Sequence, residues 1–248
     1  LEQKFSCAGR TDKNVSAISQ VLSFHTFDQS ITEKSIVEKF KASRVHAEGN
    51  IRLLKCWRMP REFNALYCAT WRRYIYMFPL NIKSYTPVVH EPITDPRSSG
   101  VNFGWHPVEI GSKTYLVDVD VATVNLLLQE LEDKELPYDA YAYRDKRCGG
   151  ETKDMCTLFK ARATAVDVSR WVPSNSGEPN LFLAIELVGN RFLRKMVRIL
   201  SGTAIRESTT IGSDVSYSAL VDIALSSDRL RASAALPGEG LCMCGVGY

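Results

Sequence analysis

The order of apolar and polar residues along the chain predicts several strands. Residues 70–78 are rich in aromatic and β-branched side chains, and Leu22, Phe24 and Thr26 share one face of an alternating stretch. Both patterns are typical of strands that bury one side. Strands are predicted at residues 20–27, 51–57, 70–78, 158–168 and 181–188, with a short final strand near Gly245.

Helices are predicted where apolar residues recur at helical spacing. The clearest case is residues 120–131, whose apolar positions are Val121, Val124, Leu127, Leu128 and Leu131. Further helices are predicted at residues 32–43, 190–205 and 217–226, and the Thr32 hydroxyl can cap the first of them.

A proline-rich segment separates two groups of these elements. Five prolines fall from Pro79 to Pro107, which is typical of a linker or insertion running over the surface. Strands and at least one helix lie on each side of it. The predicted fold class is therefore α+β, with two similar halves of mainly antiparallel sheet flanked by helices and a cleft between them. We expect an N-terminal half at 1–84, an insertion at 85–113 and a C-terminal half at 114–248.

Composition excludes several classes of protein. The chain of 248 residues is 45% hydrophobic and 24% charged, an ordinary globular balance, and no apolar run approaches the ~20 residues of a membrane-spanning helix. Seven cysteines without a Cys-x-x-Cys pair indicate free thiols in an intracellular, reducing compartment. Cys242 and Cys244 could begin a metal site, but none of the four histidines lies beside a cysteine.

Candidate chemistry is concentrated near the start, in Gly9-Arg10-Thr11-Asp12. Taken alone, this is compatible with a simple turn in which Asp12 hydrogen-bonds locally. A lone carboxylate in a cleft can also attack an electron-poor carbon or remove a proton. Two further blocks favour the second interpretation.

One block is residues 63–76, an aromatic strand in which Tyr74 and Tyr76 share a face and could simply pack. The other begins at Gly189 and carries a set of basic residues at helical spacing: Arg191, Arg194, Lys195 and Arg198. So many neighbouring cations repel one another unless an anion compensates. The net charge of +3 is too small to decide the matter, but a phosphate backbone would fit this block, and Arg198 could also pair with Asp12.

Together these blocks resemble the TruA-type tRNA pseudouridine synthases. Residues 9–12 resemble the family's Gly-Arg-Thr-Asp signature, and residues 63–76 resemble its Phe-His-Ala-Arg-x-Ser-Ala-x-x-Arg-x-Tyr-x-Tyr segment. Residues 192–202 resemble its Phe-Leu-x-x-Met-Val-Arg…Gly helix. Weaker matches at 139–144 and 237–248 extend the resemblance over most of the chain. Residues 13–17 are closer to eukaryotic members. The family's first strand and helix have no counterpart, so we expect an N-terminally truncated member.

The resemblance implies an isomerase that converts uridine to pseudouridine in tRNA, in the anticodon stem-loop, without a metal or organic cofactor. Asp12, Tyr74 and Arg198 would be catalytic, with Tyr74 stacking on the target base. Because that base must leave its stack, Arg10 would occupy or support the vacated space. Phosphates would be bound by Arg72, Arg73, Arg191, Arg194 and Lys195. The implied partners are tRNA or another structured RNA and, as in bacterial relatives, a second copy of the chain; no membrane is expected.

Two alternatives stay open. Asn14, Asn64 and Leu66 replace the family's usual glycine, histidine and arginine, as a catalytically silent RNA-binding module of the same fold could allow. A glycosidic-bond hydrolase using Asp12 would need a second carboxylate at a matched spacing, and none is obvious.

Overall fold

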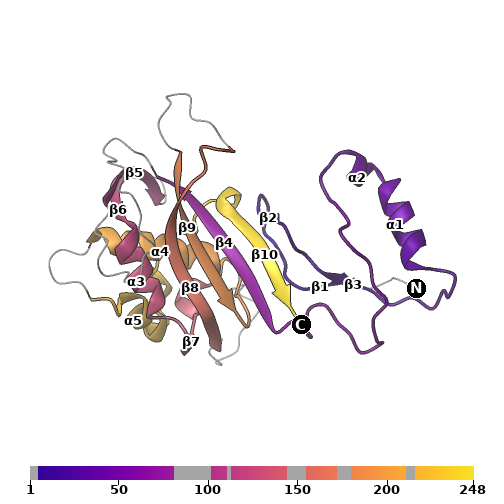
Figure 1. Cartoon of the computed structure of the whole chain (residues 1–248). Coiled ribbons are helices and arrows are strands. Elements are labelled where there is room, and N and C mark those ends of the chain that lie inside the picture. The colour runs from indigo at the N-terminus through magenta and orange to yellow at the C-terminus, as the bar shows by residue number, and fades with distance from the viewer. Residues whose placement is uncertain (1–4, 81–101, 111–112, 144–154, 172–179, 211–215) are drawn as a thin grey trace, which may run out of the picture. The chain divides into compact units, whose positions relative to one another are not determined.

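The computed structural model describes residues 5–80, 102–110, 113–143, 155–171, 180–210 and 216–248 (Figure 1). The chain divides into two compact units. The smaller unit comprises Leu1–Gly9 and Val21–Ala69, and the larger unit comprises Arg10–Gln20 and Thr70–Tyr248.

The smaller unit has little regular structure. Strands β1 (Ser6–Cys7) and β3 (Leu22–Ser23) pair antiparallel, and helices α1 (Glu33–Lys41) and α2 (Arg44–Ala47) follow. As predicted, α1 begins after Thr32, whose hydroxyl accepts a hydrogen bond from the Ser35 N–H.

Two strand predictions in this unit need correction. The predicted strand at 20–27 is only the two residues of β3. Residues 51–57 form no strand at all. Their apolar side chains Ile51, Leu54 and Trp57 are exposed, so the alternating pattern there has no buried face to match.

The larger unit is built on a six-stranded sheet in the order β2-β10-β4-β9-β8-β7. Its strands are β2 (Ser16–Ala17), β4 (Trp71–Pro79), β7 (Glu135–Pro137), β8 (Met155–Asp167), β9 (Leu181–Gly189) and β10 (Leu241–Gly247). All neighbouring pairs are antiparallel except β2 and β10, which run parallel. β4, from the N-terminal part of the chain, lies at the middle of this sheet.

Three helices, α3 (Val121–Gln129), α4 (Met196–Thr210) and α5 (Ala219–Ser226), form a layer on one side of this sheet (Figure 1). The Asp120 carboxylate caps α3 by accepting from the Ala122 N–H. The core between the layers includes Val124, Leu127, Leu128, Ile185, Leu187, Met196, Ile199 and Leu200. The fold class is thus α+β with a mainly antiparallel sheet, as predicted.

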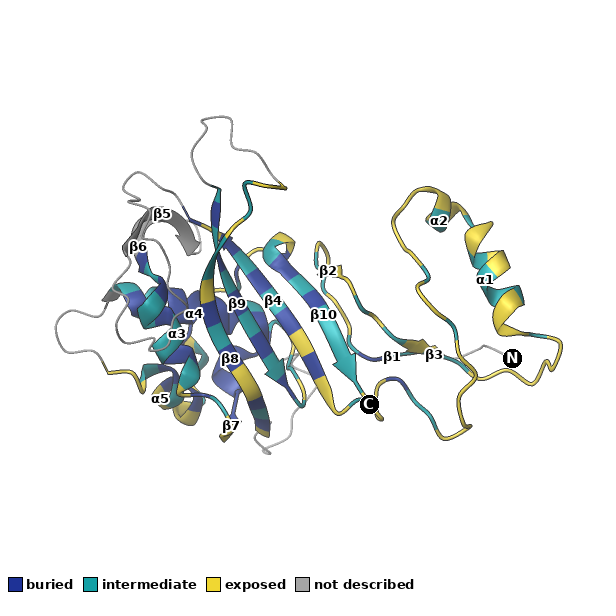
Figure 2. Cartoon of the chain, viewed as in Figure 1, coloured by how far each residue is buried: buried dark blue, intermediate teal, exposed yellow. Residues whose placement is uncertain are grey.

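The pleat of β4 separates neighbouring residues onto two faces. Arg72, Tyr74, Tyr76 and Phe78 are buried, whereas Trp71 and Arg73 are exposed (Figure 2). Successive side chains of a strand point to opposite faces. We call the side away from the helices the open face of the sheet.

Helix α4 begins later than predicted. Residues 190–195 are not helical, and Lys195 has a left-handed backbone with φ of 62°. That conformation cannot continue an α-helix of L-residues. Three of the four basic residues predicted for one helical stripe, Arg191, Arg194 and Lys195, therefore lie in a connection before the helix.

Strands β5 (Asn102–Ile110) and β6 (Lys113–Asp120) pair antiparallel. β5 lies inside the predicted insertion at 85–113, and β6 begins at its last residue. Residues 85–101 and 111–112 of that insertion lie outside the described residues. The predicted boundaries of the two halves stay a prediction. In the ranges that the structure describes, no helix is long and apolar enough to cross a lipid bilayer.

Candidate active site

Asp12 lies on a tight turn that precedes β2. The Val15 N–H donates to the Asp12 carbonyl oxygen at 3.2 Å, and Asn14 within the turn has φ of 68°. Asparagine adopts this left-handed backbone more readily than most residues. Asn14 therefore accommodates a left-handed backbone at a position where the family pattern has glycine.

Arg198, in the first turn of α4, is bonded directly to Asp12. Its Nη1 donates to Asp12 Oδ2 at 3.0 Å, and its Nε donates to the Leu236 carbonyl oxygen at 2.5 Å. The side chains are 14% exposed for Arg198 and 33% exposed for Asp12. Partial burial strengthens such a charge-assisted bond, because less water screens it. The pairing expected from the sequence is present.

The segment around the short 3-10 helix η4 (Gly238–Gly240) holds the turn from its other side. Asn14 Nδ2 donates to Glu239 Oε1 at 2.6 Å. A side chain at position 238 would approach the Lys13 carbonyl oxygen to 2.8 Å, so only glycine allows this close packing. The Asp12 turn is therefore clamped between α4 and η4.

Tyr76 supports the same segment from β4. Its hydroxyl donates to the Pro237 carbonyl oxygen at 3.0 Å. Burial raises the pKa of Tyr76 to about 12, against an opposing effect of the Arg198 charge. Hydrogen bonds from its own backbone and from Asn14 lower the pKa of Glu239. At neutral pH, Tyr76 is therefore a neutral donor and Glu239 an ionised acceptor.

Tyr74 lies one pleat period from Tyr76 on the same face of β4. Only 7% of the residue is exposed. Its ring packs edge-on against Phe192, with centroids 4.9 Å apart. Tyr74 is thus a core contact, and its catalytic role stays a prediction.

The basic residues predicted to bind RNA do not form one group. Arg72 is buried and its Nη1 donates to the Asn190 carbonyl oxygen at 2.7 Å, whereas Arg73 lies on the open face. Arg194 and Lys195 gather around the ring of Tyr143, at 5.5 and 4.5 Å from its centroid. Arg10 and Arg191 are exposed. The structure therefore places Arg73 on a different face from Asp12.

The sequence contains the site's other supports, but they were not predicted. Leu236, Pro237 and Gly238 act through backbone atoms and close packing, so their roles cannot be read from residue type, although Pro237 and Gly238 fall in a segment that matches the family. Tyr143 could have been noticed, because it lies in residues 139–144, one of the segments that resemble the family. Among the described residues, no three His, Cys, Asp or Glu side chains gather as a metal site would require.

Comparison with known proteins gives consistent relatives. The chain is 24% identical over 98% of its length to tRNA pseudouridine synthase A of Francisella philomiragia, covering 77% of that protein. It is 27% identical over 97% of its length to the enzyme of the same name from Roseiflexus castenholzii, covering 74% of it. For the Lysinibacillus sphaericus enzyme of that name, identity is 28% over 99% of this chain and 82% of that protein. No model of a known protein family matches the sequence.

Similarity of this kind spans nearly the whole chain, including all the motif blocks. The chain is similar to enzymes named tRNA pseudouridine synthase A over nearly its whole length. In this chain, Asp12 stands at the aspartate of the Gly-Arg-Thr-Asp signature. The Asp12–Arg198 pair thus links two blocks by which the sequence resembles the family.

Proposed function

We propose that this chain is a tRNA pseudouridine synthase that isomerises a uridine of the anticodon stem-loop, with Asp12 as its single essential carboxylate. The observation that carries the proposal is the Asp12–Arg198 pair, at 3.0 Å, within a chain that matches the TruA enzymes over almost its full length. The substrate RNA is inferred from the names of those relatives.

The reaction breaks the N1–C1′ bond of the uridine, turns the uracil and joins its C5 to C1′. The C5 proton is released and N1 gains a proton, so no electrons are exchanged. A carboxylate can serve by attacking an electron-poor carbon or by removing a proton near C1′. Arg198 fixes the direction of the Asp12 carboxylate, because one guanidinium bonds both the carboxylate and the Leu236 carbonyl oxygen.

The remaining residues would present the RNA to Asp12. The target base must leave its stack to reach a side chain in the protein. Arg10 is exposed two residues before Asp12, where it could enter the space that the base vacates. Arg194 and Lys195, which both lie against the Tyr143 ring, would bind phosphates. Tyr74 would stack on the flipped base after the Phe192 ring, which packs against it, moves away.

The test is release of tritium from tRNA transcripts labelled at C5 of uracil. We expect release by the unaltered chain and none by Asp12→Asn, which keeps the shape of the side chain but removes its charge. Asp28→Asn is the matched control, because Asp28 is an exposed carboxylate in the smaller unit and should leave release unchanged.

Binding of the same tRNA separates the candidate functions. Asp12→Asn should retain RNA affinity within a few fold. Salt-sensitive binding without any tritium release by the unaltered chain would favour the silent RNA-binding module. A large loss of affinity in Asp12→Asn would instead show that Asp12 is structural.

A further inference from the structure

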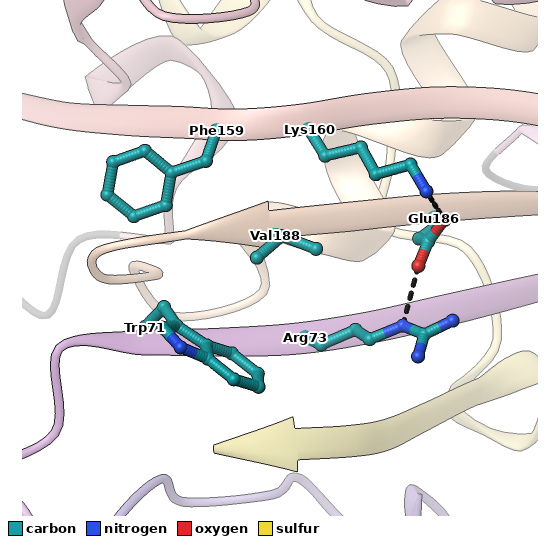
Figure 3. A pocket seen from close by; sticks show the side chains of 6 residues that line it. All are labelled: Trp71, Arg73, Phe159, Lys160, Glu186 and Val188. Atoms are coloured by element: carbon teal, nitrogen blue, oxygen red, sulfur yellow. Dashed lines mark ion pairs between the residues drawn. The ribbon is translucent and has the colours of Figure 1, made fainter. Parts of the chain in front are cut away.

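The open face of the sheet carries a hollow that the candidate active site does not use. It has a volume of about 390 Å³ and is lined by Trp71, Arg73, Phe159, Lys160, Glu186 and Val188. Figure 3 shows these side chains on three adjacent strands, β8, β9 and β4. Arg73 points to the open face, whereas Asp12 is bonded to Arg198 of α4, in the helix layer on the other side of the sheet, so this hollow and the Asp12 turn lie on different sides.

Two exposed aromatic rings flank the hollow, with Val188 between them (Figure 3). Trp71 is 37% exposed and Phe159 is 45% exposed. The Trp71 indole lies over Gly245 and Gly247 of β10, where a side chain at either position would meet it. The two glycines therefore leave room for the indole to lie against the neighbouring strand, so one ring is fixed before any ligand arrives.

The other end of the hollow is charged. Glu186 joins Arg73 Nε at 2.5 Å through Oε1 and Lys160 Nζ at 2.7 Å through Oε2. The carboxylate is sheltered, with 19% of its side chain exposed, whereas Arg73 and Lys160 are 45% and 50% exposed. One carboxylate thus positions two cations that stay about half exposed and keep further N–H donors.

These charges leave a net positive site beside two aromatic rings. Burial would raise the pKa of Glu186, but the hydrogen bonds and charges of Lys160 and Arg73 outweigh it and lower the pKa. Glu186 therefore stays ionised at neutral pH and offsets only one of the two cations. An apolar partner would gain nothing from two cations held in place, whereas a polyanion would bind to them.

We propose that the open face of β8, β9 and β4 binds a single-stranded segment of RNA, with bases on Trp71 and Phe159 and phosphate oxygens on Arg73 and Lys160. Strands lie ~4.8 Å apart, so rings two strands apart can serve neighbouring unstacked bases. Exposed aromatic rings on a sheet face bind bases with little regard to sequence, because every base has a stacking face. The inference rests on the proposed function only in taking RNA as the ligand class.

The test uses single-stranded RNA of about ten nucleotides containing 4-thiouridine. We expect ultraviolet crosslinks, located by mass spectrometry, in the peptides that contain Trp71 and Phe159. Phe159→Ala should weaken binding of this RNA about tenfold through loss of one stacked base. Lys160→Ala should lower the slope of log affinity against log salt by about 0.7.

Trp171→Ala is the matched control, since Trp171 is an exposed aromatic residue outside the hollow and should leave affinity unchanged. Equal RNA affinity in Phe159→Ala and the unaltered chain, without crosslinks at the hollow, would overturn the proposal. It would also fail if Phe159→Ala altered self-association in sedimentation while RNA binding stayed intact, because the face would then bind a second copy of the chain.

The outcomes for the two proposals can be told apart. Tritium release without crosslinks at the hollow overturns the open-face site alone. Crosslinks at the hollow without tritium release contradict only the proposed catalytic activity.

Discussion

Arg198 bonds Asp12 with one nitrogen and the carbonyl oxygen of Leu236 with another. A single guanidinium therefore sets the position of the carboxylate relative to both α4 and the segment that leads into β10. This two-way bond makes Arg198 a positioning residue, whose role differs from that of a counter-charge alone.

The first prediction concerns Arg198→Lys. An ammonium group keeps the positive charge but cannot span both acceptors with the fixed fork of a guanidinium. We expect kcat in the tritium-release assay to fall about 100-fold, as a slight misplacement of a reacting group can produce. RNA affinity should change little. The control is Arg162→Lys, because Arg162 on β8 forms an ion pair with Glu132 away from the Asp12 turn. Equal losses of kcat in both variants would contradict a specific role for Arg198.

Asn14 provides the second prediction. In Asn14→Ala, the alanine would have to adopt the same left-handed backbone, which it tolerates less well than asparagine. The variant also loses the hydrogen bond from Asn14 Nδ2 to Glu239. We expect the free energy of unfolding to fall by about 1 to 2 kcal/mol, measured by urea denaturation. Asn14→Gly should recover most of that loss, because glycine accepts this backbone freely. If the two variants were equally stable, backbone strain would not be what Asn14 relieves.

The third prediction is a pH dependence that involves Tyr76. Its pKa is about 12 in the folded chain against 10.0 for an unburied tyrosine, so the unfolded chain loses this proton first as pH rises. Stability should therefore be unaffected below about pH 10 and fall above it. Tyr138 and Tyr141 have raised pKa values as well, so they contribute to the same decline.

Tyr76→Phe isolates the contribution of one hydroxyl. At pH 7 the variant should lose about 1 kcal/mol through the missing bond to Pro237. Between pH 9 and 11 its unfolding free energy should decline less steeply than that of the unaltered chain, as thermal melts can show. Parallel curves for the two proteins would mean that Tyr76 does not titrate as its burial implies.

The fourth prediction addresses the cations around Tyr143. Replacing both Arg194 and Lys195 by Ala should reduce the slope of log affinity for tRNA against log salt by about 1.5, since two phosphate contacts disappear. Lys134→Ala, at an exposed helix-end pair with Glu130, serves as the control. An unchanged slope in the double variant would place the phosphate contacts elsewhere.

Local patterns predicted much of this fold. The helix at 120–131 and the cap at Thr32 were visible because helical spacing and a capping hydroxyl are properties of adjacent residues. The Asp12–Arg198 pair was also predicted, although from the family resemblance and complementary charge rather than from spacing. The central strand β4 followed from its aromatic and β-branched content.

The failures have physical causes of two kinds. The basic stripe at 191–198 was wrong because a left-handed residue at Lys195 breaks the helical spacing, and no sequence pattern marks such a lysine. The pleat of β4 places Arg72 and Arg73 on opposite faces, and their binding of RNA stays a prediction. The contacts from Leu236 and Glu239 join residues far apart in the chain, so only the folded structure shows them.

The parallel pairing of β2 with β10 has a consequence for synthesis. The turn bearing Asp12 emerges from the ribosome well before Cys242 and Met243, which pair with Ser16 and Ala17 from more than two hundred residues further along the chain. Until then, the residues that clamp the turn do not exist beside it. A partly made chain therefore carries Asp12 without the contacts that position its side chain.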